Sequence, residues 1–423
     1  MINRIKNILN EFNEINDYII NILEDYDNEL FFVKGKLETV RKINTISYQI
    51  KIFVIHDNYL GDAIINVFDS STDEQIKEDI ISSIKTCKNI NNKIYKLNEN
   101  IKSNDEIISN IKNHNLIDLA NDISNTIFDL ETDKEKINSL EIFIHKLKKH
   151  IISKNGLDRS ELSYNYMIEE IPTYNGNKLG DSVELYEQIN SNDINLDKIK
   201  EEIKFKLDLA KYRYEAKKPN FNNSLIALND NEIYSLFEEI IHDLNYQTIY
   251  NQSNQLKIGD IICHNDNYDK ITLKLLSKLK SSSLSSNFDN DGTTLKDVLL
   301  IDNGKIISSY GNKQYASYLN LEPTGNLNII ELNCGNKNIK DMNNYLELVS
   351  LSGLQVDLFN DYIGGEVRLA LLHENDNITP YTSFSIQAKL SDVLNNLILS
   401  KEEILNNNYH GPKLLFSNCF KLI

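Results

Sequence analysis

The sequence predicts an α+β fold of two domains: an N-terminal antiparallel sheet with long helices, and a C-terminal, mostly antiparallel β domain with a few helices. Three observations predict it. Early in the chain, apolar residues change from three- and four-residue steps to alternation, which indicates a helix followed by strands. The second half has short apolar runs separated by Asn-Gly and Asp-Gly pairs, which are typical of hairpins. Strands and helices do not alternate regularly, so we expect no parallel βαβ sheet.

Two local signals fix positions in the first half. Ser71-Thr72-Asp73 followed by Glu74 and Gln75 predicts a helix start. Asn155-Gly156 predicts a hairpin over 151–166. We expect helical residues over 1–25, from Asp73 to about Leu97, over 98–150, and over 196–216 with Asn192-Asp193 as its cap, and strands over 30–33, 36–43, 47–55, 63–68 and 182–188.

Pro219 ends the last of these helices, and we place the domain boundary in 216–222. The predicted domains are therefore 1–218 and 219–423. In the second domain we expect strands over 298–302, 305–310, 328–332, 354–359, 366–372 and 414–422, and helices over 231–245, 338–350 and 390–398.

Composition excludes several classes of protein. The 423 residues carry 62 acidic and 45 basic side chains, for a net charge of −17. This balance argues against nucleic-acid and anionic membrane surfaces, which require clustered Lys and Arg. No apolar run approaches the roughly 20 residues of a spanning helix. The first residues lack the apolar core of a signal peptide, so we expect a cytoplasmic protein.

The cysteines also indicate a cytoplasmic protein. Cys87, Cys263, Cys334 and Cys419 form no CxxC pair. So few cysteines in a chain of this length exclude a disulfide scaffold, and we expect reduced, partly buried thiols.

Common catalytic templates are missing from the sequence. It has no GxGxxG, P-loop or GxSxG motif. We interpret Glu238-Glu239 as a solvated helix face, because consecutive helical residues point about 100° apart. We place His145 and His150 on a charged helix, exposed to solvent.

Three histidine-containing segments are candidate metal sites. His373-Glu374 begins like the zinc motif HExxH, but Asn377 replaces the second His, so we predict a loop. Cys263 and His264 would face opposite sides of a strand. His242 and Gln247 would lie about 140° apart on a helix, and Gln is a poor zinc ligand. Taken alone, His242 is a partly buried histidine of an amphipathic helix.

An ordered series of motifs over most of the chain resembles the TldD/PmbA family (peptidase U62-like, "modulator of DNA gyrase"). Phe288 to Thr293, FDNDGT, is similar to the family's FDDEGT, and 298–310 resembles the hairpin that follows it. The further matches are Tyr315-Ala316, Pro323-Thr324-Gly325-Asn326, Leu354 to Val356, Gly364 to Val367, 390–399 and 412–423, with 30–41 and Ser153 to Gly156 in the N-terminal half.

The resemblance implies a role in peptide processing. Catalytic members resemble zinc metalloproteases with HExxxH on a helix ahead of the FDDEGT segment. Here HDLNYQ, from His242 to Gln247, occupies that place, with Asp243 for the Glu and Gln247 for the second His. No Cys occupies the expected Gly-rich loop, since we place Cys419 inside the last strand. This departure implies the PmbA/TldE-like branch, which lacks the zinc motif and pairs with a catalytic TldD partner.

The leading hypothesis is therefore a non-catalytic subunit of a cytosolic zinc metalloprotease complex that processes or degrades unfolded peptides. We expect no metal or cofactor in this chain, zinc in a TldD-like partner, and a dimer with that partner or with itself. One alternative is a self-sufficient metallopeptidase whose divergent site uses His242 and Asp243. Another is a non-proteolytic regulator that binds peptides or proteins. Neither nucleic acid nor membrane is expected as a partner.

Overall fold

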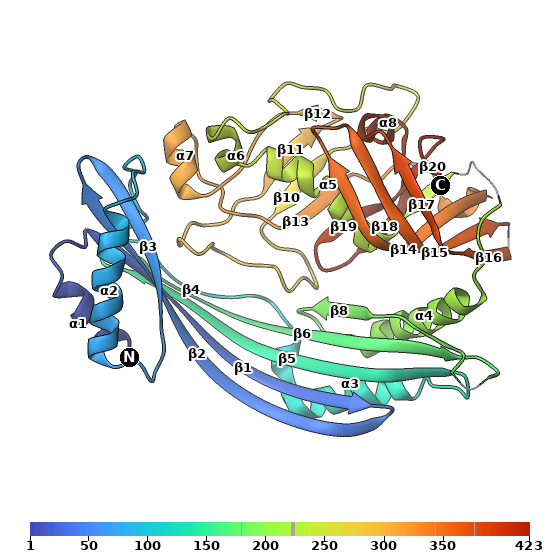
Figure 1. Cartoon of the computed structure of the whole chain (residues 1–423), viewed down its shortest axis with the longest axis horizontal. Helices are drawn as coiled ribbons and strands as arrows, with labels where there is room; N and C mark the ends of the chain where they lie inside the picture. Colours follow the sequence, from blue (N-terminus) through green and yellow to red (C-terminus); the bar gives the residue numbers. More distant parts are fainter. Residues whose placement is uncertain (179, 221–224, 343, 376) are drawn as a thin grey trace.

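The computed structural model describes residues 1–178, 180–220, 225–342, 344–375 and 377–423. These residues form an α+β fold on two sheets rich in antiparallel pairs, which confirms the predicted fold class. The N-terminal sheet is long and curved, and the C-terminal half of the chain lies on its concave side (Figure 1). The predicted domain division at 218/219 stays a prediction, and residues 221 and 222 of the expected boundary lie outside the described residues.

The N-terminal sheet, where it is described, has eight strands in the order β3-β2-β1-β5-β6-β4, with β7 and β8 paired to β6. They are β1 (Asp17–Val33), β2 (Lys36–His56), β3 (Tyr59–Val67), β4 (Lys102–Glu106), β5 (Glu135–Ser153), β6 (Asp158–Asn175), β7 (Ser182–Glu184) and β8 (Glu187–Ser191). Ile20 of β1 pairs with Ile50 of β2 and Ile152 of β5. Because side chains alternate along a strand, Ile20 and Ile22 face one side and Ile19 the other.

Helices cover the side of this sheet to which Ile20 points. The helices α1 (Ile2–Asn10) and α2 (Asp73–Cys87) share a core with β1, β2 and β3. The helices α3 (Leu116–Phe128) and α4 (Leu196–Glu215) share a second core with β1, β5 and β6. A short 3-10 helix, η1 (Ile111–Asn113), precedes α3. The other, concave face is left for contact with the C-terminal half.

The C-terminal sheet has twelve strands among the described residues, in the order β12-β11-β10-β13-β19-β9-β14-β15-β17-β20, with β16 paired to β15 and β18 to β19. They are β9 (Ile226–Leu228), β10 (Leu273–Leu276), β11 (Val298–Asp302), β12 (Lys305–Ile306), β13 (Ile329–Leu332), β14 (Asn344–Asp357), β15 (Tyr362–Glu374), β16 (Asn377–Tyr381), β17 (Phe384–Ala388), β18 (Leu397–Leu405), β19 (Tyr409–Phe416) and β20 (Lys421–Leu422). The accompanying helices are α5 (Asp230–Asp243), α6 (Tyr246–Tyr250), α7 (Lys313–Leu319), α8 (Leu390–Asn395) and the 3-10 helix η2 (Ile339–Asp341). The largest apolar core lies between α5 and this sheet.

Several predicted elements are confirmed. Thr72 caps α2: its hydroxyl accepts the N–H of Gln75, and the Gln75 side chain accepts the N–H of Thr72. Asn155-Gly156 turns the β5–β6 hairpin. The helices predicted over 196–216 and 231–245 are α4 and α5, although α4 is capped by Asn195 and not by Asn192-Asp193.

Other predictions are wrong, and packing on both faces of a strand explains the largest errors. The helix expected over 1–25 ends at Asn10, and β1 follows. Ile19 is buried against the C-terminal half, while Ile20 and Ile22 are buried under the helices. Because both faces of β1 carry apolar residues here, their spacing in the sequence resembles that of a helix. The helix expected over 338–350 is mainly β14, because Leu348 and Val349 are buried on opposite faces of that strand.

The segment 98–150 is helical only in η1 and α3, among the described residues, and its remainder includes β4 and β5. Charged residues in β5 obscure its alternation of apolar and polar side chains. Of its two partner strands, β1 lies far earlier in the sequence and β6 follows directly. Smaller errors concern ends: α2 stops at Cys87 instead of Leu97, α8 stops at Asn395, the strand over 182–188 is divided into β7 and β8, and Cys419 lies between β19 and β20 instead of inside a strand.

Candidate functional site

The FDNDGT segment, residues 288–293, meets the concave face of the N-terminal sheet. Phe288 is fully buried (0% exposed) in a cluster with Ile19, Phe53 and Ile151 of that sheet. Lys149 of β5 places its Nζ 4.9 Å from the centre of the Phe288 ring. Such a contact adds cation–π attraction to the apolar burial. Phe288 therefore joins the two halves of the molecule.

Two buried charges of β6 fix the main chain around Phe288. Glu161 is 5% exposed and accepts the N–H of Asn287 at 2.6 Å, the amide of Asn287 at 2.6 Å and the hydroxyl of Ser286 at 2.8 Å. Arg159 donates to the carbonyl of Gly292 at 3.1 Å. Buried charges are costly unless they are paired in this way. The segment is thus held rigidly against β6.

Asp289 uses its two carboxylate oxygens differently. Oδ1 accepts the N–H of Asp291 at 3.0 Å and that of Thr293 at 2.9 Å, which closes an Asx turn. Gly292 supplies the positive φ that the turn needs, at +75°. Oδ2 is buried and accepts no hydrogen bond within the described part of the chain. Burial, and then the charge of Asp291, raise the pKa of Asp289 to about 6.

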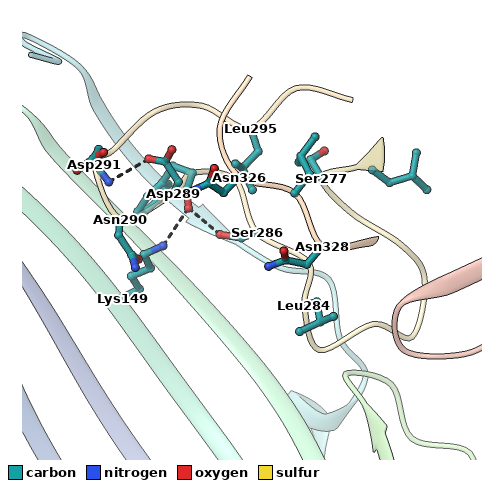
Figure 2. Close-up of a pocket in the computed structure, with 13 residues that line it drawn as sticks. Lys149, Ser277, Leu284, Ser286, Asp289, Asn290, Asp291, Leu295, Asn326 and Asn328 are labelled. Atoms are coloured by element: carbon teal, nitrogen blue, oxygen red, sulfur yellow. Dashed lines mark hydrogen bonds between the residues drawn. The ribbon is translucent and has the colours of Figure 1, made fainter. Parts of the chain in front are cut away.

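A polar pocket of about 260 Å³ lies beside this turn, between β5 and the C-terminal half (Figure 2). Lys149 enters it from the N-terminal sheet and donates to the carbonyl of Phe288 at 2.9 Å. A Cβ added to Gly325 would come within 3.4 Å of Asp289 Oδ2, so the Pro323–Asn326 segment lies against that oxygen. The other lining residues are Leu276, Ser277, Leu284, Ser286, Phe288, Asn290, Asp291, Leu295, Asn326, Leu327 and Asn328. Two motifs that the resemblance singled out thus converge on one cavity.

The sequence-derived zinc candidates do not form a site. The helix α5 ends at Asp243 and α6 begins at Tyr246, so His242 and Gln247 lie on different helices. His242 is exposed instead of partly buried. Asp243 is 5% exposed, and its carboxylate accepts the N–H groups of Gln255, at 2.9 Å, and Leu256, at 2.8 Å. Its role is to hold the loop after α6.

Three other histidines considered in the sequence are paired with carboxylates. His145 and His150 lie on β5, not on a helix, and contact Asp25 at 3.3 Å and Asp158 at 2.8 Å respectively. His373 lies near the end of β15 instead of in a loop, with Nε2 2.9 Å from Glu347.

The other candidates are dispersed. Cys263 is buried while His264 is exposed, and Glu238 and Glu239 form an exposed helix face as expected. All four cysteines are free. No three His, Cys, Asp or Glu side chains come together as a metal site in the described residues. No helix there is long and apolar enough to cross a membrane.

Sequence reasoning missed Lys149, Arg159 and Glu161. A usable signal existed, because the register of a hairpin follows from its turn. The Asn155-Gly156 turn pairs Lys149 with Glu161 and Ile151 with Arg159. The expected helix over 98–150 concealed this consequence.

The fold and the pocket define a class of α+β protein in which a curved N-terminal sheet and a second sheet enclose a polar site. Residues 226–420 match the model of the PmbA/TldA metallopeptidase C-terminal domain. This match assigns the C-terminal half of the chain to the C-terminal domain of the PmbA/TldA metallopeptidases. A search of curated protein sequences found no match.

Solved structures support the same fold over the whole chain. TldE from Thermococcus kodakarensis superimposes with a TM-score of 0.81 at 17% identity, covering 100% of this chain and 99% of that one. A candidate modulator of a DNA gyrase from Thermotoga maritima gives 0.80 at 14% identity, covering 100% of both chains. A candidate modulator of DNA gyrase from Bacteroides thetaiotaomicron gives 0.76 at 15% identity, covering 99% and 97%.

Proposed function

We propose that this chain is a non-catalytic, PmbA/TldE-like subunit of a cytoplasmic TldD/PmbA-type zinc metallopeptidase that processes unfolded peptides. The family supplies the class of activity. The observation that carries the non-catalytic role is the state of Asp243, whose carboxylate is buried and accepts two main-chain N–H groups. A general base must instead reach a water beside the metal.

The local residues do not fit zinc. Two ligands from a HExxxH motif must project from one helix toward one point. Here α5 ends between the two positions, and Gln247 belongs to α6. An amide is also a poor replacement for an imidazole beside zinc. We therefore assign no step of peptide hydrolysis to His242 or Asp243 of this chain.

In the proposed assembly the partner contributes the activation of water on zinc. This chain contributes binding surface. Its polar pocket lies where the curved N-terminal sheet meets the 288–293 turn, and it offers the Lys149 ammonium and the Asp289 carboxylate to a peptide. Strand edges could hold the extended main chain by backbone pairing, which favours affinity over strict sequence choice. The strand β3 ends the order of the N-terminal sheet.

The test is the metal content of the purified chain, alone and co-expressed with a HExxxH-bearing homologue. We expect no stoichiometric zinc in the chain alone. In the co-purified complex we expect zinc and a peptidase activity that a chelator abolishes. The His242→Ala variant should leave the activity of the complex unchanged, because His242 is an exposed residue with no place in the proposed site.

Other outcomes redirect the assignment. Near-stoichiometric zinc in the chain alone, lost in His242→Ala, would overturn the proposal in favour of a self-sufficient metallopeptidase. No co-purifying homologue and no zinc in any preparation would favour a non-proteolytic peptide-binding regulator.

A further inference from the structure

The pocket at the 288–293 turn carries nearly balanced charge. Lys149 brings one positive charge from β5, and Asp289 brings one negative charge from the turn. Asp291 also lines the pocket, and its carboxylate shares Lys51 of β2 with Asp62, each at 3.7 Å. A free cation in the pocket would be attracted by Asp289 but repelled by Lys149, and a free anion the reverse, so the two effects oppose each other for either ion. A neutral, dipolar group is disfavoured by neither.

The pocket also has an acceptor and a donor to offer. Oδ2 of Asp289 is buried without a hydrogen-bond donor among the described residues, and a buried acceptor in this state is costly. Lys149 donates one hydrogen bond to the carbonyl of Phe288, while an ammonium has three donors. Both groups are held in place, Asp289 by the Asx turn and Lys149 by its position on β5 over the Phe288 ring.

The remaining polar surface is uncharged. The side chains of Asn290, Asn326 and Asn328 supply amides, while Ser277 and Ser286, whose hydroxyls donate to Asp297 and Glu161, supply acceptor oxygens. Amide groups both donate and accept, so they match a peptide group or a carboxamide side chain. A volume of about 260 Å³ is small beside pockets for drug-sized ligands, which measure about 300–1,000 Å³. It suits one residue of a peptide.

We propose that this pocket is a peptide subsite that takes one uncharged polar residue, with an N–H of the peptide donated to Asp289 Oδ2 and a carbonyl accepting from Lys149 Nζ. The inference rests on the proposed peptide-processing function and names its substrate class at this position: an extended segment with a small amide or hydroxyl side chain.

The experiment measures binding of a short fluorescein-labelled peptide of Ala, Ser and Asn to the full chain, by fluorescence anisotropy. Asp289→Asn keeps an oxygen to accept the turn N–H groups and replaces Oδ2 by an NH₂ donor. We expect it to weaken binding about tenfold, and Lys149→Met to weaken it several-fold. The matched control is Asp302→Asn, at the exposed last residue of β11. It should bind as the unmodified chain does.

Two further measurements complete the test: the affinity of peptides with a charged side chain, and the position at which a peptide crosslinks to the chain. Replacing the Asn of the peptide by Asp or Lys should weaken binding about tenfold. A photoreactive version should crosslink within residues 277–295 or 324–328. Unchanged affinity in a folded Asp289→Asn protein, or crosslinks only elsewhere, would overturn the subsite. If the Asp289→Asn protein does not fold, the affinities of the charged peptides and the positions of the crosslinks still test the subsite.

The two proposals can fail separately. Loss of the subsite with intact co-purification of a zinc-bearing homologue would leave the proposed function standing. Peptide binding at the pocket without any such partner would leave the subsite standing and remove the metallopeptidase role.

Discussion

At the residue scale, Gly292 combines two constraints that can be separated by substitution. Its φ is +75°, and an added Cβ would lie 2.6 Å from Leu157 Cδ2. Gly35 has nearly the same φ, +73°, with nothing within 4 Å of the added Cβ. We expect Gly35→Ala to cost about 1 kcal/mol, from backbone conformation alone. Gly292→Ala should cost about 2–4 kcal/mol, since it also crowds the Phe288 cluster.

Chemical denaturation of the two variants measures this difference. Equal free energies of unfolding for Gly35→Ala and Gly292→Ala would contradict the close contact between the turn and Leu157.

Asp27 should make stability depend on pH. It is 8% exposed on β1, and burial, then its contact with Glu29, raise its pKa from 3.8 to about 7. The groups that interact with it are Asp25 and Glu29 on β1 and His145 on β5, and Arg41 of β2 lies 3.4 Å from Glu29. Between about pH 4 and pH 7 the folded chain keeps a proton that the unfolded chain has released, so this contribution falls as pH rises through that window.

Asp27→Asn cannot ionise and should therefore raise the free energy of unfolding by about 1–2 kcal/mol near pH 8, with little effect near pH 5. Thermal or urea unfolding at the two pH values measures it. The control is Glu38→Gln, an exposed residue of β2, which should show no such pH dependence. An equal effect of Asp27→Asn at both pH values would refute the raised pKa.

At the element scale, a buried ion pair fastens α4 to β6. Lys206 Nζ lies 2.9 Å from Glu170 Oε1, and both side chains are buried. Burial raises the pKa of Glu170 to about 7 in spite of the neighbouring Lys206. Removing one partner leaves the other charge buried alone. Lys206→Met should cost about 3–5 kcal/mol near pH 8, and less near pH 5, where Glu170 can take up a proton.

The double variant Lys206→Met with Glu170→Leu should recover most of that loss, because the fully buried charge of Glu170 is removed and only the more exposed Glu187 and Glu202 lose their contact with Lys206. A double-mutant cycle by urea unfolding decides the matter. If the double variant is no more stable than Lys206→Met, the ion pair is not what fixes α4.

Local signals predicted those elements that local chemistry determines. The Thr72 cap, the Asn155-Gly156 hairpin, α4 and α5 could all be read from neighbouring residues. Only the ends of β1, β5 and β14 were predicted, within 30–33, 151–166 and 354–359. The rest of each strand could not be, because partners far along the chain bury both of its faces and erase the alternation that identifies a strand. The motifs located the turn at Asp289. They gave no reason to expect Lys149 beside it, since that contact joins residues of different halves.

At the scale of the whole molecule, two apolar contacts join the sheets. Phe288 enters the concave face of the N-terminal sheet. At the other contact, Leu209 of α4 packs with Val349, Leu369 and Leu371 of the C-terminal sheet. The polar pocket lies beside the first contact, so Phe288 helps to keep the spacing of its two walls. A substitution that weakens the contact between the halves should therefore lower both the free energy of unfolding and the affinity for the peptide.

Phe288→Ala should lower the free energy of unfolding by about 3–5 kcal/mol. It should also broaden or divide the thermal transition, because each sheet keeps its own core while one of the two contacts is lost. Scanning calorimetry measures both effects, and the same protein should lose affinity for the neutral peptide. Phe68→Ala, at a position 59% exposed, is the matched control and should change stability by less than about 0.5 kcal/mol. A single, unshifted transition in Phe288→Ala would mean that the aromatic contact does not couple the two sheets, and that α4 and the Glu161 and Arg159 hydrogen bonds hold them together and keep the pocket open.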